Sequence, residues 1–145
     1  SEDLHYQVAR MYGDLDEKNL MKEIIEDLVA RKNGKPVNRV EYANTLYQEL
    51  GDPDKAIDIL EAMRSEFLQI ESILSIKGFD KKSISRRRWN QWQKAYPEIV
   101  NSLVYIYRKN DRNFDAEIIL SDWVLRNPKD TNAQEILEQI RSGKK

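Results

Sequence analysis

Few residues of this sequence could perform acid–base, nucleophilic or metal chemistry. The chain of 145 residues has no cysteine and a single histidine, His5, so it cannot build a thiolate site or a multi-histidine zinc site. Its carboxylates gather at positions 14–17 and 23–27, where we expect turns and solvated helix faces. The first run lacks the glycine and terminal glutamate of a calcium loop, and no glycine-rich phosphate loop is present. We therefore expect no catalytic residue, no metal site and no cofactor.

One segment, at positions 81–94, concentrates positive charge and aromatic rings. It starts with two lysines, Lys81 and Lys82, and its central part contains Arg86, Arg87, Arg88, Trp89 and Trp92. Such a segment could hold phosphates or lipid headgroups by charge and stack bases on the indoles. Alternatively, the tryptophans pack inward and the arginines pair with acids such as Glu61 or Glu66. We favour the second interpretation, because one short basic helix supplies few phosphate contacts.

The overall composition excludes several classes of protein. Hydrophobic residues make up 40% and charged residues 34% of the chain, which is too apolar for a disordered charged tail and too charged for a membrane protein. With 24 basic and 25 acidic residues the net charge is -1, so global charge does not favour nucleic acid or anionic lipid. The most apolar stretch, 99–107, is far too short to span a membrane. We expect a soluble domain with a local charged patch.

The hydrophobic pattern predicts an all-α fold, because apolar residues recur at helical spacing and strand-like alternation is absent. Gly51, Asp52 and Pro53 suit a helix end, a helix cap and a first helical position, and so predict a tight turn between two helices. Pro97 is expected to open a new helix, and Ser83 or Ser85 to cap a short one before it. The expected elements are helix pairs at about 3–31, 38–76 and 97–126, an inserted helix at about 83–95, and a C-terminal capping helix at about 131–142.

Two segments share a repeat pattern. Offsets of 0, 3, 4, 7, 16, 20 and 28 separate Val100, Leu103, Val104, Tyr107, Ala116, Leu120 and Pro128. The first six offsets also separate Val40, Ala43, Asn44, Tyr47, Ala56 and Leu60. This spacing resembles that of the tetratricopeptide repeat (TPR) family. In the earlier segment Leu68 replaces the final proline, so its second helix should continue to about Leu74. A third unit, with Leu4, Val8 and Met11 on its first helix, fits more loosely.

The resemblance implies a right-handed superhelix of antiparallel helix pairs. In the TPR family the first helix of each pair lines a concave groove that binds a peptide. The corresponding positions here, besides His5, are Tyr12, Glu41, Thr45, Gln48, Asn101, Tyr105 and Arg108. The lysine and asparagine set that grips a C-terminal carboxylate in some members is absent, since His5, Ala9, Glu41 and Thr45 occupy those sites.

Three functions follow as hypotheses. We favour a non-catalytic protein–protein interaction or scaffold module that binds a partner segment in the groove. A second hypothesis is a soluble C-terminal or regulatory region of a larger enzyme, which could be membrane-bound, because the chain starts at Ser1 rather than at Met. A third is binding of nucleic acid or an anionic surface through the basic segment. The compartment is then the cytoplasm or a soluble region of a larger protein, and the sequence predicts no oligomeric state.

Overall fold

All regular secondary structure in the described part of the chain is α-helical, which confirms the prediction of an all-α protein. The computed structural model describes residues 1–31, 33–79 and 84–143. The helices within these ranges are α1 (Glu2–Asp14), α2 (Lys18–Ala30), α3 (Pro36–Gln48), α4 (Pro53–Lys77), α5 (Arg86–Lys109), α6 (Asn113–Arg126) and α7 (Thr131–Arg141).

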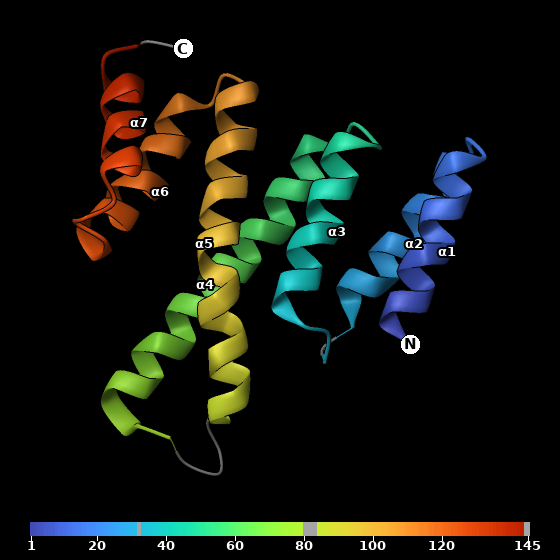
Figure 1. The fold of residues 1–145 in the computed structure, drawn as a ribbon, viewed down its shortest axis with the longest axis horizontal. Helices are drawn as coiled ribbons and strands as arrows, with labels where there is room; N and C mark the ends of the chain where they lie inside the picture. The colour runs from blue at the N-terminus through green and yellow to red at the C-terminus, as the bar shows by residue number, and fades with distance from the viewer. Residues whose placement is uncertain (32, 80–83, 144–145) are drawn as a thin grey trace.

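The helices follow one another as antiparallel pairs (Figure 1). Helix α1 packs on α2, α3 on α4, and α5 on α6, while α2 contacts α3 and both α3 and α4 contact α5. Helix α7 packs on α6 at the end of the row. The first helix of each pair and α7 all run in the same direction (Figure 1). Side chains on α1, α3, α5 and α7 can therefore contribute to one surface.

The turn between α3 and α4 has the predicted local structure. Gly51 has a φ of 62°, in the left-handed region that glycine tolerates best. The Asp52 carboxylate accepts a hydrogen bond from the Lys55 backbone N–H at 3.0 Å, and Pro53 occupies the first turn of α4. This bond and a second from Lys22 Nζ lower the pKa of Asp52. Local residue types therefore determine this connection.

Helix α4 is longer than the second helix of an ordinary repeat, as predicted from Leu68. It continues to Lys77, because no proline interrupts its hydrogen bonds. In the additional turns, both carboxylate oxygens of Glu71 accept from Arg126 Nη1 of α6 at 2.8 Å. The extension thus adds a contact between the second and third pairs.

The predicted break at Pro97 is wrong. Residues 86–109 form the single helix α5, with Pro97 in its interior and Ser85 capping its start through the Arg88 backbone N–H; Ser83 lies outside the described residues. An interior proline costs about 3 kcal/mol. Trp92 and Tyr96 before it and Ile99 after it are all buried, and each such side chain contributes about 1.5–3 kcal/mol. Packing on both sides of Pro97 therefore maintains one helix.

The predicted apolar stripe of α1 is also wrong. Leu4 and Met11 are 59% and 62% exposed, whereas Ala9 is completely buried. Ala56 and Ala116 are likewise fully buried in the later pairs. Helix α1 approaches α2 closely at Gly13, where an added Cβ would lie 2.7 Å from Met21 Sδ. The face that α1 buries is therefore centred on Ala9 and not on the larger residues.

Candidate binding groove

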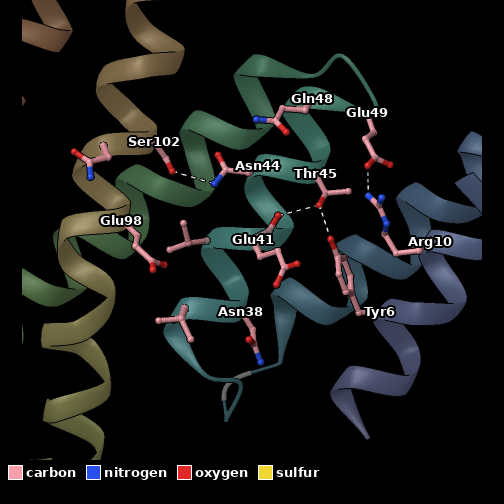
Figure 2. Close-up of a pocket in the computed structure, with 13 residues that line it drawn as sticks. Tyr6, Arg10, Asn38, Glu41, Asn44, Thr45, Gln48, Glu49, Glu98 and Ser102 are labelled. Carbon is pink, nitrogen blue, oxygen red and sulfur yellow. Dashed lines mark hydrogen bonds and ion pairs between the residues drawn. The ribbon is translucent and has the colours of Figure 1, made fainter.

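Two neighbouring cavities open along the first helices of the pairs. The first, of about 840 Å³, lies between α1, α3 and α5 (Figure 2). The second, of about 660 Å³, lies between α5, the start of α6 and α7. Asn101 of α5 lines both, so the two cavities adjoin. We refer to them together as the groove.

Six of the seven predicted groove residues line these cavities. Glu41, Thr45 and Gln48 of α3 line the first, Tyr105 and Arg108 of α5 line the second, and Asn101 lines both.

On α1 the residues that line the first cavity are Tyr6 and Arg10. Tyr12, the predicted groove residue, lines neither cavity. His5 also lies elsewhere, with Nδ1 2.9 Å from the Ser1 carbonyl oxygen. The cavity lining on α1 therefore differs from the predicted positions.

The sequence holds a signal for this lining. Ala9 and Ala43 are 34 residues apart, and both are completely buried. This alignment places Tyr6 and Arg10 at the positions of Val40 and Asn44, which also line the first cavity. The large apolar residues of α1 obscured the signal, because they suggested a different buried face.

Hydrogen bonds join α1 to α3 across the first cavity. Thr45 has one hydroxyl hydrogen, which it donates to the Glu41 carbonyl oxygen at 2.9 Å. The Tyr6 hydroxyl, 2.9 Å from Thr45 Oγ1, must therefore donate to Thr45. Burial of this phenol raises the pKa of Tyr6, so it remains a donor at neutral pH. Thr45, which is 6% exposed, thus fixes the cavity wall more than it offers a free contact.

Further polar contacts hold the same wall. An ion pair joins Arg10 to Glu49, and the Tyr42 hydroxyl donates to Glu2 Oε1 at 2.9 Å. We call the contacts between α1 and α3 the polar joint; its members are Glu2, Tyr6, Arg10, Tyr42, Thr45 and Glu49. On the other side of α3, the Asn44 amide donates to Ser102 Oγ of α5 at 3.0 Å. Both neighbours of α3 are thus positioned by directional bonds.

Several polar groups remain directed into the first cavity. Gln48 of α3 and Glu98 of α5 extend toward it, as does Glu41 (Figure 2). Within the described ranges, the side chains of Gln48 and Asn101 make no hydrogen bond with another residue. Primary amides both donate and accept, so they can bind the N–H and C=O groups of a peptide backbone.

The second cavity combines an apolar base with aromatic and cationic groups. Val104, Leu120 and Ile136 supply apolar surface. The ring of Tyr105 is 51% exposed and meets Tyr47 of α3 edge-on, with ring centroids 6.4 Å apart. This arrangement can accept an apolar side chain and an adjacent polar group.

Aromatic residues of the basic segment pack inward. Trp92 is 1% exposed, and the Trp89 ring stacks on Phe67 with centroids 5.1 Å apart. The indoles therefore contribute to the interface between α4 and α5, as the favoured interpretation predicted.

The arginines of the basic segment contact different groups. Arg88 Nη1 donates to the Gly34 carbonyl oxygen at 2.9 Å, Arg86 lies over the Phe79 ring at 4.5 Å, and Arg87 is exposed. The acids proposed as their partners contact other groups: Glu61 accepts from Tyr107, and Glu66 pairs with Arg39 at 3.6 Å. Lys81 and Lys82 lie outside the described residues.

Across the described ranges, no three histidine, cysteine or acidic side chains are grouped so that they could hold a metal ion. None of the helices described has the length and apolar character that crossing a membrane requires. Comparisons with protein-family models, with curated protein sequences and with solved structures gave no match.

Proposed function

We propose that this protein is a non-catalytic interaction module that binds an extended segment of a partner protein in the groove. The observation that carries the proposal is the alignment of two adjoining cavities along α1, α3, α5 and α7. A TPR-like superhelix would present the first helices of its pairs in this way. The offsets shared by the second and third pairs support that relationship.

The chemistry of the groove favours a peptide over a small molecule. Amides that lack internal partners line its middle, and these can pair with backbone groups of an extended chain. Tyr105 and the apolar surface beside it offer a site for a side-chain anchor, since aromatic residues with partial exposure are common at protein interfaces. The function therefore depends on docking, with affinity from the anchor and register from the amides.

The alternative of nucleic-acid binding through the basic segment is less well supported. Stacking on bases requires open indole faces, whereas Trp92 is buried and Phe67 covers one face of Trp89. Arg88 is also directed toward the backbone of Gly34. The exposed cations left at the start of α5 supply few phosphate contacts.

A selection experiment tests the proposal. The full chain would be immobilised and used to select binders from a phage-displayed library of random linear 12-residue peptides. Selected peptides should bind the wild-type chain and lose at least tenfold in affinity to the Tyr105→Ala/Arg108→Ala double variant. Fluorescence polarisation of labelled peptides provides the affinities, and thermal melting followed by circular dichroism verifies that the variant is folded.

The matched control changes one exposed residue outside the groove. An Arg87→Ala variant removes a cation of the basic segment without altering either cavity, and it should bind the selected peptides as the wild type does. Peptides that lose affinity to Arg87→Ala and retain it with Tyr105→Ala/Arg108→Ala would contradict the groove as the binding surface.

A further inference from the structure

We propose that the two cavities of the groove select opposite charges in the partner, so that its bound segment carries a basic residue and, about five residues away, an acidic residue beside an apolar anchor. This inference rests on the proposed function and specifies the partner's chemistry. The acidic end of the groove would bind the base, and the end nearest α7 would bind the anchor and the acid.

The first cavity has an excess of negative charge. Its carboxylates are Glu41, Glu49 and Glu98, and its one cation is Arg10. Arg10 already pairs with Glu49. Glu41 and Glu98 face the same space from α3 and α5 (Figure 2), and within the described ranges neither forms an ion pair with a base. A lysine or arginine of a partner would bring a positive charge to this pair of carboxylates.

The second cavity has cations where a partner can reach them. Arg108 and Lys109 of α5 line it, and Lys109 Nζ lies 5.6 Å from the centre of the Tyr105 ring. Two acids, Asp111 and Asp130, also line this cavity. Asp130 accepts from the Trp123 indole at 3.0 Å and from the Ala133 backbone N–H. Within the described ranges neither Arg108 nor Lys109 forms an ion pair with an acid. A partner carboxylate would gain two cations next to an apolar base, which places its apolar neighbour on Val104, Leu120 and Ile136.

The charges on α5 set the spacing. Glu98 and Arg108 are ten positions apart on one helix, which corresponds to about 15 Å along its axis. An extended peptide advances about 3.3 Å per residue and covers this distance in about five residues. A helical ligand would satisfy its own backbone and leave the amides of Gln48 and Asn101 unpaired, so the extended form is the one that fits.

The peptides selected from the random library test this inference through their sequences. We expect a lysine or arginine and an aspartate or glutamate separated by four to six residues, with an apolar residue next to the acid. Raising the salt concentration from 50 to 500 mM should weaken their binding at least threefold, because both end contacts are ionic.

A charge exchange gives the sharpest test. Glu98→Lys should reduce the affinity of a selected peptide at least tenfold, and the same peptide with its base replaced by glutamate should bind this variant better than the original does. The matched control, Glu23→Lys, reverses an exposed carboxylate on α2 outside the groove and should have no such effect. At the other end of the groove, Arg108→Glu should reduce the affinity of a selected peptide. Its control, Lys94→Glu, reverses an exposed cation outside the groove and should have no such effect.

The outcomes separate the two proposals. Peptides that require Tyr105 and Arg108 but show no charge pattern, or no recovery on charge exchange, would overturn the opposite-charge inference and leave the proposed function standing. A selection that yields no groove-dependent peptide would overturn both.

Discussion

The two interfaces that α3 and α5 make with neighbouring pairs are built from different chemistry. Helix α2 packs on α3, and the polar joint connects α1 to α3 through hydrogen bonds and an ion pair, with a single ring contact among the described residues, that of Tyr6 with Tyr42 at 5.2 Å. Between α4, α5 and α6, four rings form an aromatic cluster, with centroid distances of 3.9 to 6.1 Å. Its members are Phe67, Trp89, Tyr96 and Trp123.

This difference predicts unequal stability along the chain. A hydrogen bond contributes a net of about 1 kcal/mol, whereas burial of a large aromatic side chain contributes about 1.5–3 kcal/mol and each ring pair about 0.5–1.5 kcal/mol more. The aromatic cluster should therefore hold the second and third pairs as one unit. The polar joint should hold the first pair more weakly while fixing the orientation of the groove wall.

The largest effect is expected beside the aromatic cluster. Trp92→Ala should lower the free energy of unfolding by about 3–5 kcal/mol, because it leaves a cavity where a completely buried ring was. Urea unfolding followed by circular dichroism measures this change. Leu125→Ala is the control: Leu125 is 83% exposed, and its removal should change stability by less than about 0.5 kcal/mol. Similar costs for the two variants would contradict the packing described.

A smaller and local effect is expected in the polar joint. Tyr6→Phe removes the bond to Thr45 and should cost about 1 kcal/mol. Native-state hydrogen exchange should show faster exchange in α1 and α2 and unchanged exchange in α5, because the lost bond joins the first pair to α3 and involves no residue of α5. Thr45→Ser, which keeps the hydroxyl, should retain most of the protection. Uniformly faster exchange in every helix would show that the first pair does not open separately.

The smallest effect at neutral pH concerns the phenol of Tyr42. Burial, followed by the hydrogen bond to Glu2, raises the pKa of Tyr42. The unfolded chain therefore loses this proton at a lower pH than the folded chain does. The free energy of unfolding should be constant up to about pH 10 and fall above it.

Replacing Tyr42 by phenylalanine measures how much its phenol contributes to the fall in the free energy of unfolding at alkaline pH. Tyr42→Phe should make the decline above that pH less steep, whereas Tyr105→Phe, at a half-exposed ring, should change it less. Urea unfolding at a series of pH values measures both slopes. An identical decline in Tyr42→Phe and the wild type would contradict the assignment. Burial likewise raises the pKa values of Tyr6, Tyr96 and Tyr107, so part of the decline should remain.

Features that depend on neighbouring residues were predictable from the sequence. Gly51, Asp52 and Pro53 specify their turn whatever surrounds them, and the missing proline at Leu68 accounts for the length of α4. The break expected at Pro97 followed from a local rule and is wrong, because buried residues on both sides of Pro97 favour one helix. Their burial depends on α4, which lies far from Pro97 in the sequence.

The candidate site was predictable where the repeat spacing is regular. On α3 and α5 the offsets place Glu41, Gln48 and Tyr105 at the groove. On α1 the pattern misled, because the exposed Leu4 and Met11 resemble a buried stripe while the small Ala9 is the residue in contact. The partnership of Arg10 with Glu49 could not be read from the sequence, since it joins two helices whose relative placement the sequence does not state.

The proposed function requires that partners bind in the groove and not on the basic segment. Backbone amide chemical shifts of the ¹⁵N-labelled chain, titrated with a selected 12-residue peptide, locate the bound peptide on the protein. We predict that the largest shifts occur at Gln48, Asn101 and Tyr105, with residues 86–92 unchanged. Shifts concentrated at residues 86–92, with the groove unchanged, would contradict it.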